Sequence, residues 1–361
     1  MRTLVKVLHG CLRASNAVAF VVMVTAMGGC SMIDEDLSDF GNESKIDYEL
    51  ELITNLSIEL QTQLNMGLET NVSGALSEHL KTIFTDFAHD VDLSFYDTQG
   101  DSARLHHDQH IMDANQQSYT LYLPMREYMH LAAANVVDNA QVGLANDEHC
   151  HPSMLQQIQR DTITPHTTGL FTARLPMSMQ EGKDQTFSAK LYMANCAAAL
   201  VVDPRGYDTK DMQVFADGFA SGFNICDSAF VFSERSSLVK ADQLDIKNGS
   251  LLCFCSVNFP SREPKPTRSV IVTEEPFIAQ PSDESLWEFR VYLPKPGSNQ
   301  SRSGGSITET VLRVREPLRA GELKIIKGYV NDDGSVMTDS PEVGVSVTLD
   351  WTPGGVYHPN I

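Results

Sequence analysis

The chain has 361 residues and a formal net charge of −20, from 27 lysines and arginines against 47 aspartates and glutamates. This acidic balance argues against nucleic-acid binding, which requires clustered basic side chains that displace counterions from phosphates. The length favours two domains, since a domain commonly has roughly 100–200 residues.

The first 29 residues have the three-part form of a secretory signal. Arg2, Lys6 and Arg13 give a positive start, and residues 17–26 form a short apolar run. That run is too short for a membrane span, which needs roughly 20 apolar residues. Small residues then precede a cysteine in the segment Met27-Gly28-Gly29-Cys30.

Residues 27–30 resemble the lipobox of bacterial lipoproteins, with Met27 in place of the usual leucine. We predict cleavage between Gly29 and Cys30, leaving Cys30 as an N-palmitoyl, S-diacylglycerol cysteine. Three acyl chains bury many methylenes at about 0.8 kcal/mol each, so attachment would be permanent. The alternative is an ordinary signal peptide, or an uncleaved anchor, in which Cys30 is incidental. The acidic residues 34–36 resemble a surface-export signal.

Alternation of apolar and polar residues dominates the rest of the chain and predicts half-buried strands. The clearest examples are residues 46–52, 119–123, 287–293 and 345–351. Further strands are expected at residues 91–97, 129–135, 169–175, 187–194, 229–232, 269–273, 308–314 and 323–330. Leu-Pro pairs at Pro124, Pro176 and Pro294 are expected to close three strands, because proline cannot donate to a ladder.

One helix is expected behind an N-cap at Ser73, from a stripe of apolar residues: Leu76, Leu80, Ile83, Phe84 and Phe87. A helix among so many short strands favours β-sandwiches over a Rossmann or TIM architecture. We expect a signal peptide at 1–29, a lipidated tether at 30–44, and β-sandwich domains at 45–195 and 196–361. The second domain is expected to end in a tail.

Five cysteines follow Cys30: Cys150, Cys196, Cys226, Cys253 and Cys255. An odd number cannot be fully paired, and no disulfide map is assigned. Cys253 and Cys255 would share one face of a strand, either as buried thiols or as a redox pair.

The segment Asp147-Glu148-His149-Cys150-His151 is the densest group of potential metal ligands. Zinc sites usually draw ligands from two separated knuckles, and no matching second half is evident. The patch of His106, His107 and His110 is better explained by a solvated strand or turn. We therefore predict no metal, no cofactor and no catalytic site, so the chain is not expected to be an enzyme. Trp287 and Trp351 are expected in the core and not on a glycan-binding surface.

Several stretches, in order, resemble the FimB/Mfa-type family of fimbrial anchor lipoproteins of Bacteroides-like bacteria. They are the lipobox at Cys30 and residues 36–39, 87–97, 119–124, 128–132, 191–200 and 347–351. Phe40 stands where many relatives carry a further cysteine, so a pairing through that position is not expected. The resemblance implies two tandem transthyretin-like β-sandwich domains with one or two short helices.

The resemblance also implies a place at the base of a fimbrium, on the outer membrane and exposed at the surface. Related pilins assemble by strand exchange after an arginine-specific protease removes an N-terminal strand. Here no arginine lies between Cys30 and Ala103, so that protease could not remove the first strand. We therefore expect an anchor that retains the fimbrium and limits its length, with the major stalk subunit as partner and residues 343–361 as the contact. The alternative is a surface lipoprotein that binds a glycan or a host protein, or a tip adhesin.

Overall fold

The computed structural model describes residues 43–52, 58–84, 89–99, 101–111, 118–145, 148–180, 185–247, 249–264, 285–294, 307–338 and 345–348. The predicted signal peptide, Cys30, Phe87, the strand at 269–273 and Trp351 lie outside the described residues.

The first β-sandwich is built from a seven-stranded sheet with the order β3-β2-β5-β9-β10-β1-β4. Its strands are β1 (Glu43–Leu52), β2 (Asp90–Asp97), β3 (Arg104–Ile111), β4 (Ser118–Pro124), β5 (Glu127–Ala134), β9 (Phe171–Ser178) and β10 (Gln185–Met193). β9 and β10 pair only at Tyr192↔Thr172 and Met193↔Phe171. The sheet therefore folds at this corner into two layers, and one apolar core contains buried residues of both.

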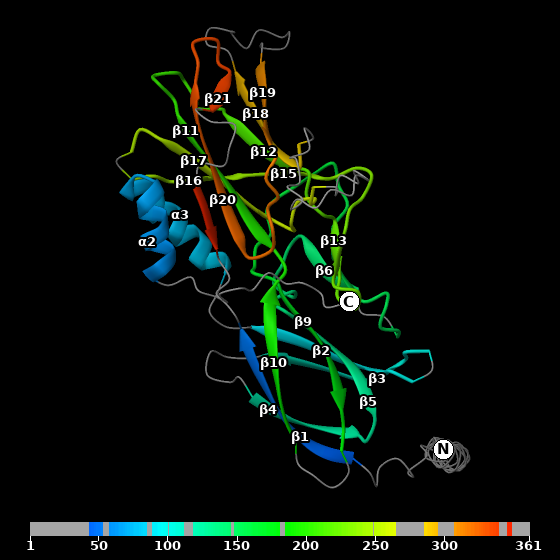
Figure 1. Ribbon diagram of the computed structural model, residues 1–361. Coiled ribbons are helices and arrows are strands. Elements are labelled where there is room, and N and C mark those ends of the chain that lie inside the picture. The colour runs from blue at the N-terminus through cyan, green and yellow to red at the C-terminus, as the bar shows by residue number, and fades with distance from the viewer. Residues whose placement is uncertain are drawn as a thin grey trace, which may run out of the picture. The chain divides into compact units, whose positions relative to one another are not determined.

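Two helices, α2 (Ile58–Gly67) and α3 (Thr70–Ile83), lie beside the second half of the molecule (Figure 1). The predicted stripe is confirmed for Leu76, Leu80 and Ile83, which are buried in α3. The predicted N-cap is wrong, because the helix begins before Ser73, whose buried hydroxyl donates to the Thr70 carbonyl at 3.1 Å. The sequence pattern does not predict α2, because its apolar residues do not gather into a pronounced stripe on one face as those of α3 do.

A six-stranded sheet and a five-stranded sheet form the second β-sandwich. The six-stranded sheet contains β11 (Cys196–Asp203), β16 (Asp242–Leu244), β17 (Leu252–Asn258), β20 (Glu322–Val330), β21 (Val336–Thr338) and β22 (Val345–Thr348). The five-stranded sheet contains β8 (Thr162–Ile163), β12 (Gln213–Asp217), β15 (Leu238–Lys240), β18 (Trp287–Pro294) and β19 (Ile307–Val314). Alternate residues of β11 face two different cores: Ala198 and Leu200 pack against the five-stranded sheet, whereas Ala197 and Ala199 belong to the core that includes the helices.

A smaller four-stranded sheet combines strands from both halves of the chain. It contains β6 (Val142–Ala145), β7 (Met154–Gln157), β13 (Gly222–Asn224) and β14 (Ala229–Val231). Its apolar residues share a core with Tyr96 and Leu131, which lie on the other face of the first sandwich. Strands from before and after Asn195 therefore pair directly here. The predicted domain boundary at Asn195–Cys196 stays a prediction.

Two of the three proline-closed strands are confirmed, since β4 ends at Pro124 and β18 ends at Pro294. The third expectation is wrong, because β9 continues through Pro176 to Ser178. Pro176 pairs with Met129 of β5, and the pairing of β9 with β10 is confined to its first two residues. The missing N–H of proline is tolerated where a strand has one open edge.

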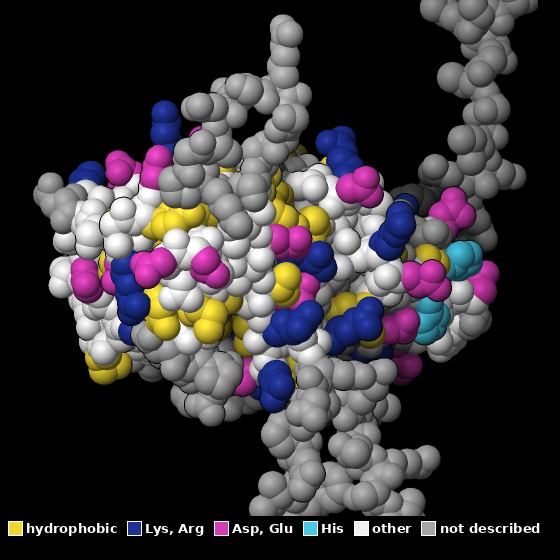
Figure 2. All heavy atoms as spheres, turned by 90° about the horizontal axis from the view of Figure 1, so that it is seen from above, with side chains coloured by type: hydrophobic (Ala, Val, Ile, Leu, Met, Phe, Trp, Pro, Cys, Tyr) yellow, Lys and Arg dark blue, Asp and Glu magenta, His cyan; other side chains and the backbone are white. Residues whose placement is uncertain are grey.

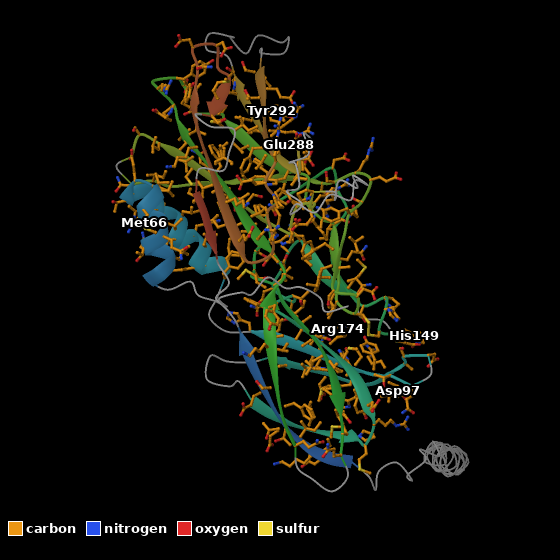
Figure 3. All side chains as sticks on the ribbon, viewed as in Figure 1. Met66, Asp97, His149, Arg174, Glu288 and Tyr292 are labelled. Atoms are coloured by element: carbon orange, nitrogen blue, oxygen red, sulfur yellow. A yellow bond between two sulfur atoms is a disulfide. The ribbon has the colours of Figure 1, made fainter. Side chains whose placement is uncertain are left out.

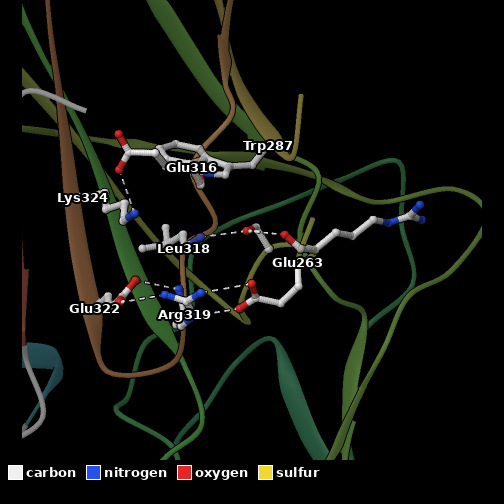
Figure 4. Close-up of polar contacts among 9 residues, drawn as sticks. Glu263, Trp287, Glu316, Leu318, Arg319, Glu322 and Lys324 are labelled. Atoms are coloured by element: carbon white, nitrogen blue, oxygen red, sulfur yellow. Dashed lines mark hydrogen bonds and ion pairs between the residues drawn. The ribbon is translucent and has the colours of Figure 1, made fainter. Parts of the chain in front are cut away.

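Polar contacts hold the segment before β20 against the second sandwich (Figure 4). Trp287, which is 1% exposed, donates its indole N–H to the Glu316 carbonyl at 2.8 Å. The buried ammonium of Lys324 lies 3.1 Å from the Glu316 carboxylate. Arg319 forms two hydrogen bonds with Glu263, at 2.8 and 3.2 Å. The core position predicted for Trp287 is confirmed.

The mainly β fold with sandwich layers and two short helices is confirmed. Acidic and basic side chains lie next to one another on the face in Figure 2, with apolar side chains between them. Within the described ranges, no helix is both long and apolar enough to cross a membrane.

Candidate functional site

The strand nearest the predicted lipid site is β1, and it lies inside the first sandwich and not at its edge. β1 pairs in parallel with β10, from Ile46↔Gln185 to Leu52↔Leu191. On its other side it neighbours β4, as the order β10-β1-β4 shows. Ile46 is fully buried in the apolar core. Removing β1 would therefore open a gap between two strands and expose part of the core.

Polar contacts on the exposed face of β1 add to this attachment. Lys45 lies 3.2 Å from the Asp47 carboxylate, and the hydroxyl of Thr120 on β4 donates to that carboxylate at 3.1 Å. The hydrogen bond from Lys45 and that from Thr120 lower the pKa of Asp47. Because Lys45 and Asp47 are exposed, these contacts contribute little to stability.

The C-terminal contact region predicted at 343–361 is described only over β22. This strand pairs antiparallel with β20, from Glu322↔Thr348 to Ile325↔Val345. It also lies beside α2. The contact with a stalk subunit stays a prediction.

The histidine and cysteine cluster forms a second candidate site. Cys150 and Cys226 form a disulfide with a Cα–Cα distance of 5.8 Å, across a sequence separation of 76 residues. It crosslinks the loop before β7 to the turn after β13. The second half that the sequence reasoning did not find is Cys226-Asp227. The sequence did contain a signal for it, because Cys226-Asp227, like Cys150-His151, is a cysteine next to another potential ligand.

His151 belongs to this site and His149 does not. The His151 Nδ1 atom lies 3.0 Å from an Asp227 carboxylate oxygen and 3.9 Å from the Cys226 sulfur. His149, labelled in Figure 3, instead contacts the Asp101 carbonyl at 3.1 Å, beside the isolated bridge that it forms with Ala103. Asp147 lies outside the described residues, and Glu148 accepts a backbone hydrogen bond from Arg104 through its carbonyl.

The histidine patch at 106–110 lies on the strand β3, as the sequence suggested. His106 pairs with Asp108 at 2.8 Å, and His107 pairs with Asp92 of β2 at 2.7 Å. His106 and His107 thus each have their own carboxylate, and these two side chains lie on opposite faces of the strand. This arrangement explains the patch without a ligand.

The three remaining cysteines of the second half are buried free thiols: Cys196, Cys253 and Cys255. Cys253 and Cys255 lie in the same core, which confirms that they share one face of β17. Burial raises the pKa of the Cys253 thiol to about 12, and that of Cys255 is also raised. A raised pKa suppresses the thiolate that redox chemistry requires. The buried-thiol interpretation therefore fits better than the redox pair.

A comparison with protein-family models finds no match, and a search of curated proteins finds none either. The chain is similar in structure to a candidate polysaccharide-binding protein (DUF1812) of Bacteroides thetaiotaomicron VPI-5482, with 9% identity, a TM-score of 0.49, and coverage of 85% of this chain and 99% of the other. It is also similar to a candidate adhesin of Bacteroides ovatus ATCC 8483, with 11% identity, a TM-score of 0.48, and coverage of 78% and 86%.

The similar structures include the fimbrial anchor protein Mfa2 of Porphyromonas gingivalis. The identity is 9% and the TM-score is 0.44, and the match covers 82% of this chain and 95% of that one.

Proposed function

We propose that this chain has a fimbrial role at the cell surface, where it holds a fimbrium on the outer membrane and limits its length. The observation that carries the proposal is the placement of β1 between β10 and β4. The residues that connect this strand to Cys30 contain no arginine, and the first arginine after Cys30 is Arg104. An arginine-specific protease would therefore leave β1 joined to its predicted lipid.

A retained β1 explains why such a subunit would be an end and not a link. A strand removed from between two neighbours leaves two rows of unpaired backbone groups, which a strand from another chain can fill. With β1 in place, those groups of β10 are already paired, from Gln185 to Leu191. The first sandwich then cannot accept a donor strand between β10 and β4. The chain would contact the major stalk subunit elsewhere and stop growth at that end.

The lipid supplies the second half of the function. Three acyl chains on Cys30 would hold the protein on a membrane against loads that one chain could not resist. Because the same polypeptide runs from Cys30 into β1, any assembly on this protein would remain attached to the membrane. No enzymatic step is required for this role, and the partner is a protein strand or surface.

The experiment places an arginine in the tether of the full-length protein in the producing cell. Asp39→Arg is expected to allow cleavage by the arginine-specific protease and to release fimbriae into the medium. Asp39→Lys is the matched control, since it makes the same change of charge without creating the cleavage site. Cys30→Ser tests the lipid separately, and deletion of the gene should release fimbriae that are longer than normal.

Fimbriae in the medium and on cells are measured by immunoblotting and electron microscopy. Cell-bound fimbriae of normal length in the deletion strain would refute the anchoring role. Equal release from Asp39→Arg and Asp39→Lys cells would show that an uncut tether between Cys30 and β1 is not the reason for retention. Loss of adhesion to a glycan, with fimbriae unchanged, would favour the surface-binding alternative.

A further inference from the structure

Four potential metal ligands meet where the loop before β7 approaches the turn after β13. They are the sulfur atoms of Cys150 and Cys226, the imidazole of His151 and the carboxylate of Asp227. The ligand atoms of His151, Cys226 and Asp227 all lie within 4.8 Å of one another, and Cys150 is bonded to Cys226. In the disulfide form neither sulfur is a thiolate, so the set is incomplete.

The two halves of this cluster are held together by contacts other than the disulfide. The side chain of Asn224 donates to the His151 carbonyl at 2.6 Å and accepts from the Asp227 N–H at 2.8 Å. The Ile225 N–H donates to the Ser153 carbonyl at 3.0 Å, and β13 pairs with β7 directly beside them. None of these contacts involves a sulfur atom, so opening the disulfide does not itself break them.

Two of the distances between ligand atoms are near those of a tetrahedral zinc site. Zn–S bonds of about 2.3 Å and Zn–N or Zn–O bonds of about 2.1 Å give tetrahedral edges of roughly 3.4–3.8 Å. In the structure, the His151 Nδ1 atom lies 3.9 Å from the Cys226 sulfur and 3.0 Å from the Asp227 carboxylate oxygen. Metal binding also requires the disulfide to open to a non-bonded sulfur pair, and the Cys150 sulfur to move toward the other three ligand atoms, whose group does not include it.

We propose that reduction of the Cys150–Cys226 disulfide converts this cluster into a zinc site with Cys150, His151, Cys226 and Asp227 as ligands. A dithiol donates two electrons and two protons, so the sulfur–sulfur bond breaks, two thiols form, and the reductant becomes a disulfide. Zn²⁺ then binds both sulfurs, and their two protons pass to the solvent. His151 binds through neutral Nδ1, and Asp227 as the carboxylate.

The ligand set selects zinc over the common hard cations. Two thiolates, an imidazole and one carboxylate suit Zn²⁺, whereas Ca²⁺ and Mg²⁺ prefer oxygen ligands. The side chains of His151 and Asp227 are 74% and 51% exposed, so an ion can enter from the solvent. The two cysteines are buried, with residue exposures of 2% and 4%, and this would hold the sulfurs in place below the ion. The metal would then replace the disulfide as the crosslink between the two segments.

The test measures zinc binding to the full chain before and after reduction. The protein is reduced with dithiothreitol, desalted without oxygen, and titrated with zinc chloride by calorimetry, with the stoichiometry checked by native mass spectrometry. One ion is expected per reduced chain and none in the disulfide form. Co²⁺ in place of zinc should give a thiolate-to-cobalt charge-transfer band.

Variants assign the ligands. The double variant Cys150→Ser and Cys226→Ser should bind no zinc, although it keeps the three buried thiols that could otherwise bind metal. His151→Ala should weaken binding at least tenfold, and Asp227→Asn should weaken it less, because an amide oxygen can still coordinate. His149→Ala is the matched control and should bind within twofold of the wild type.

Three results would overturn the proposal. The first is a reduced protein that retains the circular dichroism of the disulfide form and binds no zinc. The second is equal binding by the double serine variant or by His151→Ala. The third applies if the reduced protein unfolds. Zinc should then restore a cooperative thermal transition, and a reduced protein that stays unfolded with zinc would overturn the proposal.

Discussion

Replacement of Asn195 by alanine should destabilise the protein more than any exposed asparagine does. Asn195 is fully buried between a loop of the first sandwich and the start of β11. Its side-chain oxygen accepts from the Leu170 N–H at 3.2 Å, and its amide donates to the Thr168 carbonyl at 2.9 Å. The variant Asn195→Ala removes both contacts without adding a polar group that could replace them.

The magnitude follows from the two groups that lose a partner. A buried donor or acceptor left unsatisfied costs about 1–3 kcal/mol, which gives about 2–6 kcal/mol for the pair. The Thr168 carbonyl keeps a long contact of 3.5 Å from the Asn139 amide, so its loss is partial. We therefore expect the free energy of unfolding to fall by about 2–4 kcal/mol. The free energy of unfolding of Asn195→Asp should be lower still, because a carboxylate cannot donate to the Thr168 carbonyl.

The assay is urea unfolding of the chain from residue 31 onwards, followed by tryptophan fluorescence and by circular dichroism. Asn331→Ala is the matched control, because the Asn331 amide donates to a surface-turn hydroxyl at 3.3 Å. That change should cost less than about 1 kcal/mol. A cost below about 0.5 kcal/mol for Asn195→Ala, or one equal to the control, would refute the reasoning.

Three further predictions concern stability. Replacing Cys150 and Cys226 by serine removes a crosslink over a separation of 76 residues and should cost about 4 kcal/mol by loop entropy, measured by urea unfolding under oxidising conditions. Burial lowers the pKa of His166 from 6.5 to about 3, so the folded protein holds this histidine neutral. The resulting stabilisation is complete above pH 6.5, and below pH 6.5 the free energy of unfolding should fall by about 1 kcal/mol per pH unit. His166→Gln should reduce this slope. Glu316→Ala leaves a buried lysine without its carboxylate and should cost more than Glu263→Ala, whose exposed ion pair is worth under about 1 kcal/mol; equal unfolding midpoints would contradict this.

The strands that could be predicted from the sequence are those with one buried face and one solvent-exposed face. Leu121 and Leu123 are buried while Tyr122 between them is 58% exposed, and this alternation is visible in the sequence. β11 has no such alternation, because apolar residues on both of its faces are buried by different cores. A short apolar run without a period cannot be distinguished from a buried helix by pattern alone.

The candidate sites depended on pairings between distant residues. The absence of arginine between Cys30 and Arg104 is a property of the sequence, but the placement of β1 between β10 and β4 follows from a parallel pairing across more than a hundred residues. Similarly, the cluster at His151 was visible, and its other half at Cys226 was not, because nothing local links the two. Local chemistry identified the residues, and only the topology of the sheets brought them together.

The buried thiols of the six-stranded sheet give the protein an internal reporter of its own opening. Cys196, Cys253 and Cys255 lie on the central strands β11 and β17, and burial raises the pKa of each thiol. An alkylating reagent reacts with thiolates, so labelling at these positions requires the two strands to separate. Counting labelled cysteines by mass spectrometry on cells would measure how often this sheet opens, with no dye or added tag.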